Sequence, residues 1–305
     1  MRNAFDGILL VDKNRGDSSF EVVSKIRKIL KVKKAGHAGT LDPFATGLLV
    51  VLMGQGTKLS PYLMSVEKRY LATVRLGVET DTLDPTGRVT RTMPVPHLSP
   101  EFIQEKAEGL IGEIEQVPPM FSAIRHNGTR AYVLARNGIS FDLQKRRVKI
   151  LDLKILSVDL PDVTLVLECS KGAYVRSIAA EMGRRLGTGA HLRVLRRISS
   201  GPFEVGNAVK VEGIAGQDHA ISDRIISLRH ALPHMPEAEV PELMAQNIRR
   251  GIRPEWDAIA GLAELGESFC GYVKLINGME LVAIIRVYRS SDEKERCFDL
   301  MRVFT

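Results

Sequence analysis

The sequence predicts a large α+β domain followed by a small β domain. Segments that alternate like strands are interspersed with segments of helical periodicity through the first two thirds of the chain. Residues 232–241 contain three prolines, as expected of a linker. Beyond them, two β-rich segments flank an Asn-Gly pair, which is a hairpin signal. The length of 305 residues is sufficient for both domains.

The first elements of the large domain are a strand, a helix and a loop. We expect the strand at residues 5–11. Ser18 and Glu21 form a capping box, and apolar residues then repeat at helical spacing, which predicts a helix to about Leu30. Residues 36–47 are rich in glycine and include a proline, so we expect a loop that leads into a strand at 48–53.

Ser99 and Pro100 supply an N-cap and a first-turn proline for a further helix, which runs to about Ile111. The remaining elements follow from periodicity and turn residues. They are strands at 70–76, 147–158 and 163–170, a helix at 174–186, and strands of the small domain at 271–276, 281–288 and 297–304.

Positive charge is segregated along the chain. Lys and Arg number 43 against 36 Asp and Glu, which gives a net charge of +7 and a pI near 9.3. Residues 12–37 hold eight basic and three acidic side chains, while residues 121–150 and 171–197 each hold seven basic and one acidic. Scattered Lys and Arg are usually only a solvated surface, but this segregation favours one electropositive face for a polyanion.

Several protein classes are excluded. The longest aliphatic run, residues 48–53, is far too short to span a bilayer, and the N-terminus does not have the pattern of a signal peptide. Three widely spaced cysteines without a CxxC motif indicate neither a disulfide framework nor a zinc site. The common nucleotide-binding, serine-hydrolase and zinc-protease motifs are absent. We therefore expect a cytoplasmic protein with reduced thiols.

The loop at 36–47 is the most unusual stretch, because it presents His37 and Asp42 between core elements. A tight structural turn is the simpler explanation for Asp42 followed by proline. A single carboxylate acts as a base or nucleophile only if a partner holds its charge ready, and Arg176 is the natural candidate. Tyr174, two residues before it, is placed to stack on a base. Taken alone, a surface contact is the favoured explanation for Arg176, and a core aromatic with a bonded hydroxyl is the favoured explanation for Tyr174.

Several motifs together resemble the TruB family of pseudouridine synthases in sequence and in order. The loop at 36–47, with Leu41-Asp42-Pro43 at its centre, resembles the family's catalytic motif. The other matching segments are Val11-Asp12-Lys13, Lys68-Arg69-Tyr70, Leu76-Gly77, Thr80-Asp81, residues 117–123, residues 171–176 and Leu195-Arg196-Arg197. Together they cover nearly all of residues 5–200.

The resemblance implies a pseudouridine synthase fold, with a mixed, mainly antiparallel sheet and flanking helices. The catalytic domain is expected at 1–235. It includes a basic RNA-clamping insertion around 121–150, although residues 126–129 vary its usual basic pattern. A small β-rich domain at 242–305 is similar to the PUA domains that hold RNA.

The implied activity is isomerisation of uridine 55 in the TΨC loop of tRNA to pseudouridine, in which the glycosidic bond moves from N1 to C5. Substrate and product are isomers, so no metal, ATP or redox cofactor is expected. The expected partner is the T-arm stem-loop of tRNA, reached by extruding the target nucleotide. Neither a membrane, a guide RNA nor an obligate protein partner is expected, and the chain is expected to act as a monomer.

The resemblance also assigns roles to individual residues. Asp42 is the expected catalytic aspartate, attacking either C6 of the uracil or C1′ of the ribose, and Arg176 is expected to pair with it. The expected substrate contacts are Tyr70, which stacks on the target base, Tyr174 and Leu195, which line the uracil pocket, His37, which touches RNA nearby, and Lys13, which supports the pocket.

Two other functions remain alternatives. The first is an RNA-binding module or tRNA-folding chaperone on a synthase scaffold, for which Asp42 would be dispensable. The second is a dyskerin-type catalytic subunit that needs guide RNA and protein partners. Retention of Asp42, Tyr70 and Arg176 together favours the enzyme, and the lack of long basic tails disfavours the dyskerin type.

Overall fold

A computed structural model describes residues 5–122, 124–126, 128–139, 141–213, 221–266, 268–290 and 296–305. Within the matched motifs and the basic insertion, Ala123, Asn127 and Ser140 lie outside the described residues. Among the described residues, we find no helix whose length and hydropathy suit a membrane span.

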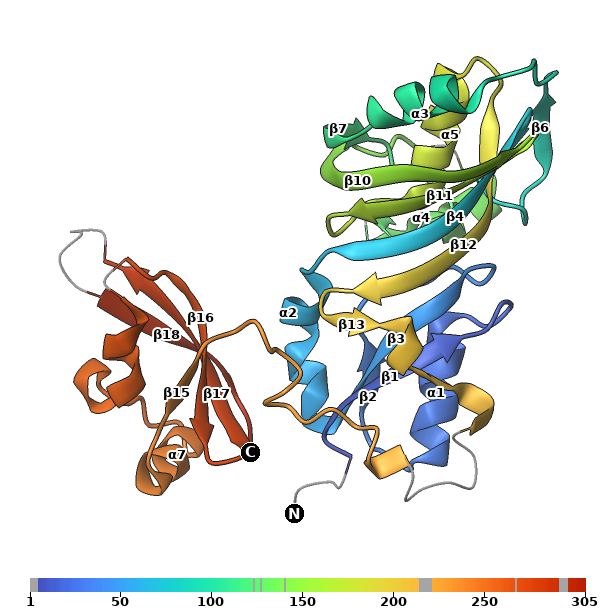
Figure 1. Cartoon of the computed structure of the whole chain (residues 1–305). Coiled ribbons are helices and arrows are strands. Elements are labelled where there is room, and N and C mark those ends of the chain that lie inside the picture. The colour runs from blue at the N-terminus through green and yellow to red at the C-terminus, as the bar shows by residue number, and fades with distance from the viewer. Residues whose placement is uncertain are drawn as a thin grey trace.

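The chain forms a ten-stranded sheet flanked by helices and a separate four-stranded sheet near the C-terminus (Figure 1). The large sheet has the order β14-β1-β3-β12-β4-β11-β10-β7, with β13 paired to β12 and β2 to β3. Its strands are β1 (Gly7–Lys13), β2 (Ala35–His37), β3 (Thr46–Met53), β4 (Lys68–Leu76), β7 (Gly112–Gln116), β10 (Arg146–Asp159), β11 (Asp162–Cys169), β12 (Ala190–Ser200), β13 (Phe203–Glu204) and β14 (Val209–Lys210).

The second sheet has the order β15-β16-β17-β18, and two short hairpins complete the strands. These strands are β15 (Glu237–Glu239), β16 (Gly271–Asn277), β17 (Glu280–Arg289) and β18 (Arg296–Val303), with hairpins β5 (Val78–Thr80)–β6 (Val89–Thr92) and β8 (Arg125–His126)–β9 (Thr129–Arg130). The α-helices are α1 (Ser19–Ile29), α2 (Ser60–Met64), α3 (Pro100–Glu108), α4 (Ala131–Arg136), α5 (Val175–Arg185) and α7 (Glu242–Arg249).

The large sheet is mixed and mainly antiparallel, which confirms the expected fold class. Only the pairs β1–β14 and β3–β12 are parallel among those described in it. The parallel pair β3–β12 joins the two halves of the sheet, and the loop before β3 lies at this junction.

The half of the sheet around β1 and β3 is buried on both faces. Leu9 and Val51 face α1, whose capping box at Ser18 is present as predicted. Ile8 and Val50 face α2 and the C-terminal sheet. Because neighbouring residues of a strand point to opposite faces, both faces demand apolar residues, and this explains the uninterrupted aliphatic run in β3.

Helices α3 and α5 cover the other half of the sheet (Figure 1). The predicted N-cap of α3 forms, with the Ser99 side chain accepting a hydrogen bond from the backbone of Phe102. Ile178 and Met182 of α5 pack in the same core as Leu165 and Leu192 of the sheet. Helix α5 is thereby fixed with its N-terminus toward the loop before β3.

The C-terminal sheet is anchored to the large domain through α2 and the 3-10 turn before it. Tyr62 packs edge-on against Tyr272, with ring centroids 5.0 Å apart. Lys58 donates a 2.7 Å hydrogen bond to the carbonyl of Val303, and Gln55 donates to Thr305. Apolar residues of β16, β17 and the C-terminus complete a shared core with β1 and β3.

Two expectations need correction. Residues 36 and 37 belong to strand β2 rather than to the loop, and β3 begins two residues earlier than predicted. The predicted linker at 232–241 contains β15, which pairs parallel with β16 and adds a hydrogen bond from Lys274 to the carbonyl of Pro236. Strands of three residues are too short to show alternation, so a pairing partner in space decides them.

Gly47 is required by the close approach of β3 and β12. Its φ is +100°, and a Cβ atom there would lie 2.3 Å from the carbonyl oxygen of Arg197. We predict that Gly47→Ala lowers the free energy of unfolding by about 1–3 kcal/mol or more, measured by urea denaturation. Gly36→Ala is the matched control, because its Cβ would meet nothing within 4 Å. Equal denaturation midpoints for the two variants would contradict the steric argument.

Candidate active site

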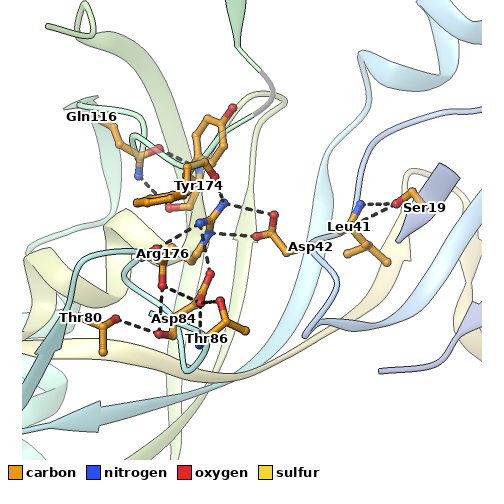
Figure 2. Close-up of polar contacts among 11 residues, drawn as sticks. Ser19, Leu41, Asp42, Thr80, Asp84, Thr86, Gln116, Tyr174 and Arg176 are labelled. Carbon is orange, nitrogen blue, oxygen red and sulfur yellow. Dashed lines mark hydrogen bonds and ion pairs between the residues drawn. The ribbon is translucent and has the colours of Figure 1, made fainter. Parts of the chain in front are cut away.

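A buried guanidinium lies at the centre of the site. Arg176, on the first turn of α5, is 4% exposed, and its Nε lies 2.9 Å from Oδ2 of Asp42 while NH2 donates to Oδ1 at 3.2 Å. NH2 also donates to the carbonyl of Phe121 at 3.1 Å, and NH1 to the carbonyl of Thr82 and to Asp84 (Figure 2). The four NH1 and NH2 donors therefore have acceptors, whereas Nε meets Asp42 as an ion pair and has no hydrogen-bond partner among the described residues. The predicted pairing of Asp42 with Arg176 is confirmed.

The loop that carries Asp42 is held rigidly by its neighbours in sequence and in space. Ser19, at the start of α1, bonds both the amide and the carbonyl of Leu41 through its hydroxyl (Figure 2). The amide of Gly16 donates to the carbonyl of Pro43 at 2.7 Å. Lys13 is fully buried and reaches the same carbonyl at 3.4 Å, as well as that of Asp17 at 2.7 Å. Hydrogen bonds to the backbone of Leu41 and Pro43, on either side of Asp42, therefore fix the position of its carboxylate.

Burial governs the ionisation of this cluster. It raises the pKa of the Asp42 carboxyl above its usual value, and the negative charge of Asp84 acts in the same direction. Arg176 and Lys13 oppose this shift. Burial also lowers the pKa of Lys13 to about 8, against the attraction of Asp17 and Asp42. Asp42 is therefore a carboxylate of increased basicity whose charged form depends on its cationic neighbours.

Asp84 is a second carboxylate on the same arginine; it is buried, and it was not singled out from the sequence. Its Oδ2 lies 3.2 Å from NH1 of Arg176. Its Oδ1 accepts hydrogen bonds from the Thr82 hydroxyl at 2.8 Å and from the amide and hydroxyl of Thr86 at 2.9 and 2.6 Å. A signal was present, because Leu83-Asp84-Pro85 repeats the tripeptide at 41–43.

The backbone of Tyr174, at the N-terminus of α5, is held by two hydrogen bonds to the side chain of Gln116, which together form a clamp. Its amide donates to Oε1 of Gln116 at 2.8 Å, and its carbonyl accepts from Nε2 at 3.0 Å (Figure 2). Gln116 is buried at the end of β7 and was also missed by sequence reasoning. The clamp takes the place of a side-chain cap and sets Tyr174 beside Arg176.

Tyr70 and Leu195 come together in the apolar wall of the site. Both are buried, on β4 and β12, and belong to one cluster with Leu41 and Phe44 of the Asp42 loop. Burial raises the pKa of the Tyr70 hydroxyl, with the charge of Arg197 opposing the shift. The structure thus brings Tyr70, Leu195 and the Asp42 loop together.

His37 lies further along the same segment, on β2. Burial lowers the pKa of its ring, and the positive charge of Arg197 adds to the shift, so the neutral imidazole is favoured. Its Nδ1 is buried and has no hydrogen-bond partner among the described residues. Arg197 is itself buried and donates to the carbonyls of Leu48 and Gly39, which ties β12 to both ends of the loop.

The structure revises the expected electropositive face. Most basic residues of 171–197 are engaged: Arg176 as above, Arg184 and Arg185 with Glu181, Arg193 with Asp162, and Arg196 with Asp12. In the segment 12–37, Lys25 pairs with Asp17, whereas six exposed cations form no ion pair with another described residue. They are Arg15, Arg27, Lys28, Lys31, Lys33 and Lys34. Among the described residues, unpaired positive charge is thus present around α1.

Among the residues that the structure describes, we find no group of three His, Cys, Asp or Glu side chains arranged as metal ligands.

Comparison with known proteins gives consistent matches. The family model described as TruB family pseudouridylate synthase (N terminal domain) matches residues 27–175, and that of the tRNA pseudouridylate synthase B C-terminal domain matches 176–233. A tRNA pseudouridine synthase B from Geobacter sulfurreducens is 40% identical, covering 98% of this chain and 99% of the relative. One from Syntrophotalea carbinolica is 39% identical and covers 98% of each.

Solved structures give a similar result. A chain of a crystallised Cbf5-Nop10-Gar1 complex superposes with a TM-score of 0.75 at 25% identity, covering 99% of this chain and 85% of that one. A chain of an archaeal box H/ACA sRNP Nop10-Cbf5 complex has a TM-score of 0.73 at 24% identity, covering 99% of this chain and 87% of that one, and shows the shared fold.

Because Asp42 and Asp84 share Arg176, the pKa of Asp42 is expected to depend on the charge of Asp84. Because the charge of Asp84 raises the pKa of Asp42, Asp84→Asn is expected to lower that pKa, as measured by ¹³C NMR titration of the Asp42 carboxyl. The asparagine Oδ1 still accepts hydrogen bonds, so folding is expected to persist. Asp81→Asn is the control, since Asp81 pairs with the exposed Arg88 outside this network. An unchanged or higher pKa in Asp84→Asn would refute the coupling.

Proposed function

We propose that this chain, which belongs to the TruB family of pseudouridylate synthases, isomerises uridine 55 in the TΨC loop of tRNA to pseudouridine. The observation that carries the proposal is the ion pair between Asp42 and Arg176, built on segments that match the family models. The carboxylate of Asp42 is the nucleophile. It attacks either C6 of the uracil or C1′ of the ribose, and both routes use the same aimed oxygen.

Arg176 prepares the nucleophile before the substrate arrives. Its planar fork holds both oxygens of Asp42, which favours the charged form against the effect of burial. Because the anchors at Leu41 and Pro43 fix the loop, little reorganisation accompanies the reaction. This is electrostatic preorganisation: folding already orients the charged groups, so no free energy is needed to reorient them during the reaction.

The target uridine reaches Asp42 only after it leaves the stack of the RNA, which costs a few kcal/mol. In the proposed complex, Tyr70 stacks on the uracil, while Tyr174 and Leu195 line its pocket. Their support is the shared cluster around the Asp42 loop and the clamp that sets Tyr174 beside Arg176. His37, whose neutral form is favoured and whose buried Nδ1 has no hydrogen-bond partner within the described part of the chain, contacts the RNA near the extruded nucleotide.

Binding of the remaining RNA offsets the cost of extrusion. We assign RNA clamping to the basic insertion around 121–150, within a catalytic domain that spans 1–235. The C-terminal sheet is proposed to be a PUA-like RNA-binding domain that begins at β15, a few residues before the predicted 242–305. Two separate contact regions are compatible with recognition of a single-stranded RNA loop by its shape and by base stacking.

The chain is proposed to act alone, as a cytoplasmic monomer without guide RNA, metal or cofactor. The similarity to tRNA pseudouridine synthases at about 40% identity over nearly the whole chain favours this over the guide-dependent alternative. Size-exclusion chromatography with light scattering tests the monomer, and activity of the purified chain on tRNA alone tests independence from partners.

Removal of the nucleophile separates the enzyme from a tRNA-folding chaperone. Asp42→Asn is expected to lower the rate of tritium release from a [5-³H]uridine-labelled T-arm stem-loop by about 1,000-fold or more. Its RNA affinity should change little, because Asp42 contributes to chemistry rather than to docking. Asp42→Ala controls for deamidation of the asparagine. Turnover like that of wild type in both variants would exclude the proposed nucleophile.

The geometry of the guanidinium is expected to matter as much as its charge. Arg176→Lys retains one positive charge but cannot reproduce five donors in a planar fork, so single-turnover rates are expected to fall by about 100-fold. Arg184→Lys is the matched control, on an exposed turn of the same helix. Circular dichroism melting checks that the variants fold. Equal single-turnover rates for the two variants would remove the proposed role of the fork.

A further inference from the structure

The start of α1 and the Asp42 loop form one hydrogen-bonded unit. The Ser19 hydroxyl bonds the amide of Leu41 at 2.8 Å and its carbonyl at 3.1 Å, directly beside Asp42 (Figure 2). The Lys13 and Gly16 bonds to the carbonyl of Pro43 tie the preceding turn to the same loop. The residue that follows Ser19 is therefore held within about 10 Å of the Asp42 loop.

That residue is Phe20, and its ring faces solvent. It is 76% exposed, although the next apolar residues of α1, Val22, Val23 and Ile26, are buried in the core. Of the large hydrophobic residues that the structure describes, it has the largest exposed fraction. An isolated exposed apolar residue is common in proteins. Here, however, the exposed group is aromatic and is joined rigidly to the proposed catalytic loop.

The same flank of the helix carries positive charge. Arg27 follows Phe20 by seven residues, so the two side chains lie on one side of α1, about 10 Å apart along the axis. Arg27 is exposed and forms no ion pair with another described residue. The nearby acidic groups are engaged, Asp17 by Lys25 at 2.7 Å and Glu21 by the amide of Ser18 at 2.7 Å. The flank is thus an aromatic ring followed by a free cation.

We propose that Phe20 and Arg27 form a binding strip on α1 for the RNA strand next to the extruded uridine. The ring of Phe20 stacks on a base that flanks the target, and Arg27 pairs with a phosphate of the same strand. A solvent-facing aromatic ring beside unpaired positive charge is the arrangement that binds single-stranded RNA. The inference rests on the proposed function, which supplies the RNA and the position of its target nucleotide.

The test measures affinity and turnover of the full chain with a T-arm stem-loop. Phe20→Ala is expected to raise the dissociation constant, measured by fluorescence anisotropy, by at least about fivefold. The single-turnover rate at saturating RNA should remain within about twofold of wild type. Phe20→Tyr should bind like wild type, and Phe20→Leu should bind like the alanine variant, because stacking requires a π-face. Leu243→Ala, at a residue 71% exposed on α7, controls for loss of exposed apolar area.

The phosphate contact has its own matched control. Arg27→Gln is expected to weaken binding and to reduce the salt dependence of the affinity by about one released counterion. Lys28 is exposed in the same last turn and shares the favourable interaction with the helix dipole, but it points to a different side. Lys28→Gln should therefore leave the salt dependence unchanged. Equal changes in affinity and salt dependence for the two substitutions would show that Arg27 has only a general electrostatic role, and the proposed binding strip would be wrong.

A double-mutant cycle identifies the stacked base. Abasic substitution of the contacted nucleotide should weaken binding by wild type, and Phe20→Ala should add no further loss on that RNA. Phe20→Ala affinity equal to wild type, or additive losses at every flanking position, would overturn the inference while wild-type turnover upholds the proposed function. A wild-type chain that binds the stem-loop without converting it would refute the function alone. One that does neither would refute both.

Discussion

The structure of the site depends on the requirement that the charge of a buried arginine be compensated by carboxylates and hydrogen-bond acceptors. Arg176 meets this requirement with two carboxylates and two backbone carbonyls, drawn from the loops around residues 42, 82–84 and 121. An unpaired buried charge costs several kcal/mol, so the three loops are fixed relative to α5. With fully buried Lys13 included, the cluster contains two positive and two negative groups. Its near neutrality stabilises the charged form of Asp42, the proposed nucleophile, whose side chain is 31% exposed.

This arrangement also sets the basicity of Asp42, the proposed nucleophile. A carboxylate paired with an arginine alone would have a low pKa and weak basicity. Asp84 shares the same guanidinium, and together with burial it shifts the pKa of Asp42 upward. Lys13 and Arg176 limit this shift. If Asp42 loses its charge in the proposed reaction, Asp84 still compensates the charge of Arg176.

Periodicity in the sequence was sufficient for the long elements, and it failed where pairing in space decides the structure. Helix α1 was predicted from the helical spacing of its buried residues, and strand β3 from its uninterrupted aliphatic run. The three-residue strands β2 and β15 were missed because they are too short to show alternation. Family resemblance led to Asp42 and Arg176. Asp84 was missed because its contact with Arg176 joins residues that are far apart in the sequence. A count of charged residues also does not distinguish buried from exposed ones, and Arg197 is buried.

The layering of the molecule constrains how one RNA can reach all the proposed surfaces. Helix α1 packs on one face of β1 and β3, and the C-terminal sheet packs toward the other face through the core that includes Phe304. An RNA that contacts both must therefore pass over an edge or an end of these strands. The end where β1 finishes at Lys13 and β3 begins at Thr46 carries the Asp42 loop. An RNA that crosses at that end would lie over the carboxylate of Asp42, so the same bound position would serve both RNA binding and the reaction.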